Sequence, residues 1–279
     1  MKYAVTIALF LLCWLPLHAE MNSIRAIKTT IGDVTVNAAY IDLHDPSLLV
    51  TPGVALDAPN NRKSFRDFLD ESDCLVQTTG AFFDLQNGEP VGDIVVRGKS
   101  LFVTSRIGSA LIVTKGNVPA IVDGPYGPFG WVECESVLQG GVRVLRRGQV
   151  AVDPASQGFH DRYMQRCTSR IAVGVMNHHV VMVQTGRVLL PELANIMLQL
   201  GCTDAMALDG GGSTGFAVNG KCIISTERKL ANVLMVVRRT PEEMFSKLQE
   251  SNLRELLPFG GSVVAEAYGW ESLGLYPPL

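Results

Sequence analysis

The sequence has few charged and aromatic residues and no large excess of charge of either sign. Only 18% of its 279 residues are charged and 7% are aromatic, and 27 acidic against 24 basic residues give a formal net charge of −3. This balance provides no basic surface for a nucleic-acid backbone, so we expect no nucleic-acid partner. The 47% of hydrophobic residues is enough for a buried core and excludes disorder for most of the chain.

Long apolar runs are missing beyond the first residues. An apolar run over residues 4–15, interrupted only by Thr6, follows Lys2 and precedes the small residue Ala19. This order is typical of a secretory signal peptide, and the run is shorter than the ~20 residues of a spanning helix. We therefore expect residues 1–19 to be a cleaved signal peptide, no membrane span after it, and a secreted or periplasmic location. An uncleaved anchor is the alternative.

Metal-binding patterns are absent as well. No cysteine spacing matches a zinc site, and the adjacent His178 and His179 point to opposite faces if they lie on a strand. We expect no metal and no cofactor. In an exported protein, the five cysteines after residue 19 predict one or two disulfides and at least one free thiol. A bridge between Cys202 and Cys222 is one option.

Short β-prone runs and tight turns dominate the remaining chain. The runs are residues 34–41, 75–78, 94–97, 110–114, 118–122, 142–146, 171–176 and 180–184. Two-residue turns with hairpin spacing are predicted at Gly98-Lys99, Gly116-Asn117 and Asn219-Gly220. The pattern therefore predicts a mainly antiparallel or mixed β-sheet.

Helical patterns are fewer. Ser64 can cap a short helix, and a clearer helix is predicted from Pro191 to Gly201, with apolar residues at helical spacing between them. A third pattern starts at Pro241. We predict an α+β fold in which the sheet packs with a few helices. It forms a single domain over residues 20–240, followed by a helical extension and tail over residues 241–279.

The segment from Asp209 to Thr214 carries the strongest chemical signal. Gly210, Gly211 and Gly212 directly follow an apolar strand, and Ser213 comes next. Unshielded backbone amides and neighbouring hydroxyl groups suit an anion such as phosphate, although a flexible turn is the alternative. No Gly-Lys-Ser/Thr follows, which disfavours a nucleotide P-loop, and no histidine follows His179, which disfavours a serine hydrolase.

Five sequence blocks occur in a fixed order. They are Thr79-Gly80-Ala81-Phe82-Phe83 with 88–92, 139–148, Ser169-Arg170-Ile171 with 172–174, 190–194, and 202–237 with Leu208-Asp209-Gly210-Gly211-Gly212-Ser213-Thr214. Together they resemble the phosphodiester glycosidase family over about residues 75–237. The sequence departs from the family pattern at two positions. Thr79 stands where the family usually has Asn, and Ile171 where it usually has Thr, and both changes bear on substrate choice and activity. The resemblance implies a hydrolase whose substrate is a glycan or glycosyl phosphate.

Glycosyl transfer from a phosphodiester requires a carboxylate and groups that bind phosphate. We assign Asp209 as base or nucleophile, with Glu192 as a second candidate that can instead stabilise the first turn of a helix. Arg170 and Arg228 are expected to clamp the phosphate together with Gly210, Gly211 and Gly212, surface ion pairing being their alternative. The remaining candidate substrate-binding residues are Ser213, Thr214, Thr79, Phe82 and Phe83, the two phenylalanines having a core role as alternative.

The prediction is thus an exported glycoside hydrolase that removes a sugar, such as one similar to N-acetylglucosamine, from a phosphodiester-linked glycan. The alternative is a non-catalytic envelope protein that binds a glycan or phosphoglycan through the same loop. A third class, an envelope assembly factor, would show neither turnover nor ligand binding. The sequence predicts no particular oligomeric state.

Overall fold

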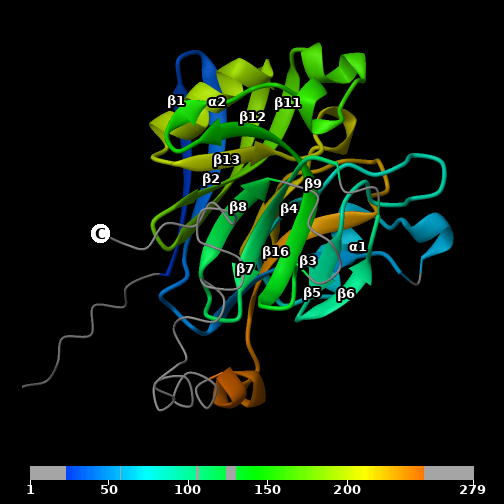
Figure 1. Cartoon of the computed structure of the whole chain (residues 1–279), viewed down its shortest axis with the longest axis vertical. Helices are drawn as coiled ribbons and strands as arrows, with labels where there is room; N and C mark the ends of the chain where they lie inside the picture. Colours follow the sequence, from blue (N-terminus) through cyan, green and yellow to red (C-terminus); the bar gives the residue numbers. More distant parts are fainter. Residues whose placement is uncertain (1–22, 57, 105–106, 124–129, 248–279) are drawn as a thin grey trace, which may run out of the picture.

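The computed structural model describes residues 23–56, 58–104, 107–123 and 130–247, which build two β-sheets and two named α-helices (Figure 1). The predicted signal peptide and residues 248–279 of the C-terminal extension lie outside these ranges. Residues 241–247 are helical, as predicted from Pro241. Within the described ranges, no helix is long and apolar enough to cross a bilayer.

The larger sheet contains eleven strands. Eight of them follow the order β1-β2-β12-β11-β13-β9-β5-β6, β7 and β10 pair with β9, and β8 pairs with β7. Its strands are β1 (Ile24–Ile31), β2 (Val34–Asp42), β5 (Ile94–Val96), β6 (Lys99–Phe102), β7 (Ser109–Thr114), β8 (Pro119–Asp123), β9 (Cys134–Arg146), β10 (Gln149–Val150), β11 (Thr168–Met176), β12 (His179–Val188) and β13 (Asp204–Ala207).

The smaller sheet has five strands in the order β15-β14-β4-β16-β3. They are β3 (Leu48–Val54), β4 (Cys74–Thr79), β14 (Phe216–Val218), β15 (Lys221–Ile224) and β16 (Asn232–Arg238). Neighbouring strands pair antiparallel in both sheets, for example β11 with β12 and β16 with β4. The predicted α+β fold with a mainly antiparallel sheet is therefore confirmed.

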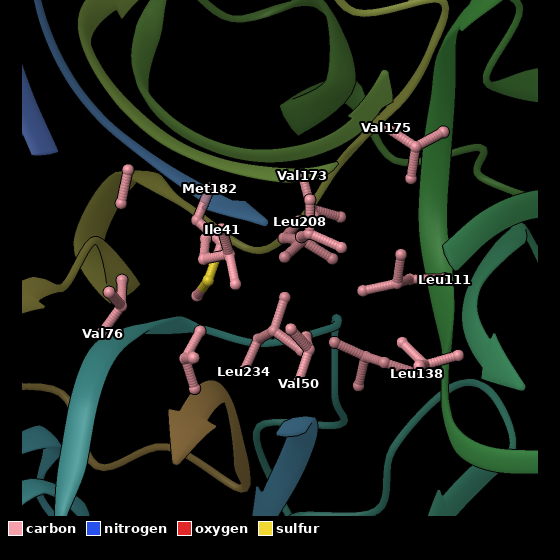
Figure 2. Packing of buried hydrophobic residues seen from close by; sticks show 14 of the residues in the cluster. Ile41, Val50, Val76, Leu111, Leu138, Val173, Val175, Met182, Leu208 and Leu234 are labelled. Atoms are coloured by element: carbon pink, nitrogen blue, oxygen red, sulfur yellow. The ribbon is translucent and has the colours of Figure 1, made fainter. Parts of the chain in front are cut away.

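The main core lies between the two sheets. Figure 2 shows Val173 and Met182 of the larger sheet, with Leu208 directly after β13, facing Val76 and Leu234 of the smaller sheet, and these five side chains belong to one buried cluster. Alternate residues of the central strands point the other way. Ala172, the neighbour of Val173 on β11, packs in a second cluster under the helix α2 (Leu190–Gln199). Because β11 and β12 are covered on both faces, they appear in the sequence as nearly continuous apolar runs.

The two predicted helices are confirmed and cover the outer faces of the sheets. The helix α1 (Phe65–Asp70) begins with the predicted cap, since the Ser64 hydroxyl accepts from the Asp67 amide and the Asp67 carboxylate accepts from the Ser64 amide. Its apolar side packs against the smaller sheet. Gly201, with a φ of 91°, follows α2 in the left-handed conformation expected of a helix C-terminus.

Several details differ from the predictions. The β5–β6 turn is formed by Arg97 and Gly98, which both have positive φ, so the turn lies one residue before the predicted Gly98-Lys99. β9 is much longer than the predicted run of residues 142–146. Polar residues and two adjacent glycines hide the strand, whose pairing with β7 shifts register at Gly140, where φ is 104°.

The predicted disulfide is wrong, because all five described cysteines are free thiols. Cys202 packs in the cluster under α2, where burial raises its pKa to about 12. Cys222 lies on β15, next to the cluster that α1 covers on the smaller sheet. The two thiols are therefore in different layers of the fold. Cysteine spacing along the sequence does not contain this information.

Candidate active site

A cavity of about 730 Å³ opens beside the glycine-rich loop that follows β13. One wall is polar and contains Asp209, Gly211, Gly212 and Arg228. Another part of the lining is mainly apolar. It is formed by Phe82, Phe83, Leu85 and Val91 after β4, and by Ile107, Phe159, Tyr163 and Met164. Pockets of this size, with a few convergent polar groups, are typical of small-molecule sites.

Each of the three consecutive glycines has a close neighbour. A Cβ atom at Gly210 would lie 2.7 Å from the carbonyl oxygen of Ser169, and one at Gly212 would lie 2.9 Å from a guanidinium nitrogen of Arg228. At Gly211 a Cβ would lie 3.0 Å from the Tyr163 hydroxyl, and its φ of 56° also favours glycine. The loop thus packs tightly among β11, Tyr163 and Arg228.

The backbone amides of Gly211 and Gly212 remain available for a ligand. In the described part of the chain neither amide donates a hydrogen bond, whereas the amide of Gly210 donates to the Asp209 carboxylate at 2.9 Å. Both glycines line the cavity. Two unused amides beside a guanidinium are a suitable site for phosphate oxygens.

Asp209 is the one buried carboxylate among the described residues that line this cavity. It is 7% exposed. Burial raises the pKa of its carboxyl from 3.8 to about 6, while the Ser213 hydroxyl, the Gly210 amide and the charges of Arg228 and Arg170 act in the opposite direction. At neutral pH the carboxylate is thus ionised but basic for an aspartate, which suits a base or a nucleophile.

Arg228 and Arg170 occupy different positions. Arg228 lines the cavity and donates to the Ser213 hydroxyl at 3.1 Å. Arg170 on β11 is fully buried and is not among the lining residues. Its guanidinium donates to the carbonyl of Arg166 at 2.6 Å and packs against the ring of Tyr163, 5.1 Å from the centroid. Burial lowers the pKa of Arg170.

Thr79 supports the loop from below and is fully buried. Its hydroxyl donates to the carbonyl of Ser213 and accepts from the amide of Gly215 at 3.0 Å. The side chain of Asn232 fixes the next turn by accepting from the Ala81 amide at 2.7 Å, and Gly80 leaves room for that side chain. The structure thus places Thr79 under the loop, away from the cavity surface.

Thr214 faces a second hollow of about 500 Å³, which shares Gly211, Gly212 and Arg228 with the first. Its hydroxyl lies 2.8 Å from that of Ser169. Ser225 and Thr226 add further hydroxyl groups to its lining. The glycine-rich loop therefore borders two hollows.

Sequence reasoning missed a further segment that lines the cavity. Phe159, Asp161 and Tyr163 line it, and the Asp161 carboxylate accepts from the Tyr163 amide at 2.6 Å to start a short 3₁₀ helix. Phe82 joins this segment, with its ring 5.4 Å from that of Phe159. An Asp two residues before Tyr163 was a local capping signal, but nothing in the sequence related it to Asp209.

Glu192 lies outside the cavity lining. Its carboxylate accepts from the Leu189 amide at 2.7 Å at the start of α2. We expect Glu192→Gln to leave kcat/KM within threefold of wild type, because glutamine can accept the same hydrogen bond. Steady-state kinetics with a glycosyl phosphodiester measures this, and a hundredfold loss with an unchanged Tm would instead make Glu192 a catalytic group.

Comparison with known proteins shows the family of this chain. The family model for phosphodiester glycosidases matches residues 72–237, more than half of the chain. N-acetylglucosamine-1-phosphodiester alpha-N-acetylglucosaminidase from Bos taurus is 24% identical over 226 residues, which are 72% of this chain and 43% of that protein. The Mus musculus enzyme of that name is also 24% identical, over 73% of this chain and 41% of its own length. The chain thus spans less than half the length of these relatives.

Solved structures show the same fold. The catalytic domain of the zebrafish enzyme of that name, auto-inhibited by its pro-peptide, has a TM-score of 0.62 at 20% identity and covers 77% of this chain and 82% of that one. A hypothetical protein from Synechocystis has a TM-score of 0.61 at 15% identity, covering 78% and 62%. The family match spans Asp209, the glycine-rich loop, Arg170 and Arg228. This chain belongs to the phosphodiester glycosidase family.

Proposed function

We propose that the protein hydrolyses the bond between a sugar and the phosphate of a glycosyl phosphodiester. The observation that carries the proposal is the single cavity in which a buried, basic Asp209 lies beside Arg228 and two unused glycine amides. The same wall supplies a carboxylate for the anomeric carbon, and positive charge and hydrogen-bond donors for phosphate.

In the proposed reaction, the bond between the anomeric carbon and the bridging oxygen breaks. The electron pair leaves with the phosphate, which departs as a monoester dianion, and the sugar develops oxocarbenium character. Ionised Asp209 either takes a proton from an attacking water or attacks the anomeric carbon itself and is then released by water. The products are the free sugar and the phosphate monoester. Because this leaving group is a weak base, one carboxylate suffices without a dedicated acid.

The two hollows suit the two arms of a phosphodiester. With phosphate at Gly211 and Gly212, the sugar occupies the larger cavity, where Asp209 can reach the anomeric carbon and the aromatic wall can contact a sugar face. The group across the phosphate then enters the second hollow beside Thr214. The names of the relatives favour N-acetylglucosamine as the sugar, and residues 1–19 favour export.

Arg228→Ala should lower kcat/KM for a glycosyl phosphodiester about 10- to 100-fold, because a charged hydrogen bond to the departing phosphate is lost. Arg228→Lys should recover part of the activity. Arg228 lies at the surface of the site, so the Tm should change little. Kinetics with both variants measures this, and values within threefold of wild type would remove Arg228 from the phosphate site.

Turnover of N-acetylglucosamine 1-(methyl phosphate) tests the function. We expect free N-acetylglucosamine and methyl phosphate in equal amounts from the wild type. Binding of the diester without turnover would instead favour the non-catalytic glycan-binding alternative. Neither binding nor turnover of this compound or its analogues with other sugars would contradict both.

A further inference from the structure

Tyr163 lies at the point where the charged and apolar walls of the cavity meet. Its ring lines the cavity and packs against Phe82, with 6.3 Å between ring centroids, while the guanidinium of Arg170 covers the ring from behind. The Asp161 carboxylate fixes the Tyr163 backbone by accepting from its amide. These contacts give the tyrosine ring a defined position.

The hydroxyl group of Tyr163 faces the glycine-rich loop. It would lie 3.0 Å from a Cβ atom at Gly211, a tight contact that, with the φ of 56° at this residue, favours glycine there. The hydroxyl oxygen is buried, and its polar neighbours, the Gly210 amide and the Arg170 guanidinium, can only donate to it, so its proton has no acceptor among the described residues. An unused buried donor costs free energy, so its position beside a binding loop indicates a role with a ligand.

Burial of the Tyr163 side chain favours a neutral phenol. Burial, followed by the negative charge of Asp209, raises the pKa of Tyr163 to about 12, although Arg170 and Arg228 oppose the shift. The hydroxyl therefore keeps its proton at neutral pH. A neutral O–H can donate to an anion where a phenolate would repel it.

We propose that Tyr163 is a ligand of the substrate phosphate, its hydroxyl donating a hydrogen bond to a phosphate oxygen held by Gly211, Gly212 and Arg228. The identity of the anion rests on the proposed function. Arg170 is in this arrangement a positioning residue, which holds the tyrosine ring and adds positive charge behind it. The sequence resemblance did not single out Tyr163.

Tyr163→Phe tests the proposal because it removes one oxygen and keeps the ring packed between Phe82 and Arg170. We expect kcat/KM for N-acetylglucosamine 1-(methyl phosphate) to fall 10- to 100-fold. The Kd for N-acetylglucosamine 1-phosphate, measured by calorimetry, should rise at least tenfold, and the Tm should stay the same or increase. The apparent pKa of about 6 in the kcat/KM profile should not move, because Asp209 is unchanged.

Tyr40→Phe is the matched control, since its hydroxyl donates to the Leu200 carbonyl at 3.3 Å, outside the cavity. It should leave kinetics and binding unchanged. If Tyr163→Phe retains kcat/KM and Kd within twofold of wild type, the ring has only a packing role and the proposal is overturned. A moved apparent pKa would also overturn it, because the hydroxyl would then act through Asp209.

The two proposals fail in different ways. Wild-type turnover that Tyr163→Phe leaves intact contradicts the role of Tyr163 alone. Absent turnover, with tight binding of N-acetylglucosamine 1-phosphate that Tyr163→Phe weakens, contradicts the hydrolase and supports the phosphate ligand. Absent turnover and absent binding contradict both.

Discussion

Asp209→Asn should lower kcat/KM at least 100-fold and, at pH 8, make the folded protein more stable. The loss of activity follows because an amide can neither attack the anomeric carbon nor take a proton from water. The gain in stability follows because burying an ionised carboxylate is unfavourable, which is the cause of the raised pKa of Asp209. Kinetics and thermal unfolding of the same variant measure both effects.

The stability effect has a defined pH dependence. The folded-state pKa of about 6 lies above the ordinary 3.8, so the folded protein binds this proton more tightly than the unfolded chain. The contribution of Asp209 is therefore most favourable below pH 4 and is lost as the pH rises through 6. At pH 8 the difference from Asn reaches about 3 kcal/mol at most, and it should disappear near pH 4.

The pH profile of kcat/KM should also report the ionisation of Asp209. We expect kcat/KM of the wild type to rise with pH along a limb with an apparent pKa of about 6, because the ionised form of Asp209 reacts. A limb that falls through pH 6 would make Asp209 a general acid. If Asp209→Asn keeps a tenth or more of the wild-type kcat/KM, Asp209 is excluded from the reaction.

Arg170→Ala should destabilise the protein by about 3–5 kcal/mol. The side chain is fully buried, and its removal leaves a cavity and takes donors from the carbonyls of Arg166 and Val188. It also removes a positive charge that stabilises ionised Asp209. Thermal or denaturant unfolding measures the loss, with Arg228→Ala as the matched removal of an arginine at the cavity surface.

The outcome would separate the roles of the two arginines. Destabilisation of Arg170→Ala together with a stable, less active Arg228→Ala agrees with Arg170 holding the site together and Arg228 contacting phosphate. If Arg170→Ala unfolds at the wild-type temperature, the guanidinium is not part of the structural core, and the original expectation of two equivalent phosphate clamps would be favoured.

The strands were predictable where hydrophobic pattern and pairing agree. The central strands β11 and β12 are buried on both faces, so their apolar runs were clear. β3 was missed because Pro52 and Gly53 interrupt its pattern, and the strand tolerates them because it lies at the sheet edge. β1 was missed as well, because it carries polar residues through much of its length, and it also lies at an edge of its sheet.

The glycine-rich loop of the candidate site was predictable from the sequence, but the buried residues behind it were not. Asp209 and the glycines form a local motif, and the structure places Asp209, Gly211 and Gly212 at one cavity wall. The sequence did not show that Arg170 is buried, because its position depends on the packing of Tyr163 and on carbonyl groups of residues 166 and 188. Contacts between distant segments determine such positions, and a single sequence contains no direct record of them.

Hydrolysis in ¹⁸O-labelled water tests the central claim most directly. With N-acetylglucosamine 1-(methyl phosphate) as substrate, the reaction assigned to Asp209 and the glycine-rich loop breaks the bond between carbon and oxygen. We therefore predict ¹⁸O in the anomeric hydroxyl of the released sugar and none in methyl phosphate, as measured by mass spectrometry. Label in the methyl phosphate would mean attack at phosphorus, and would contradict the assignment of this cavity as a glycosidase site.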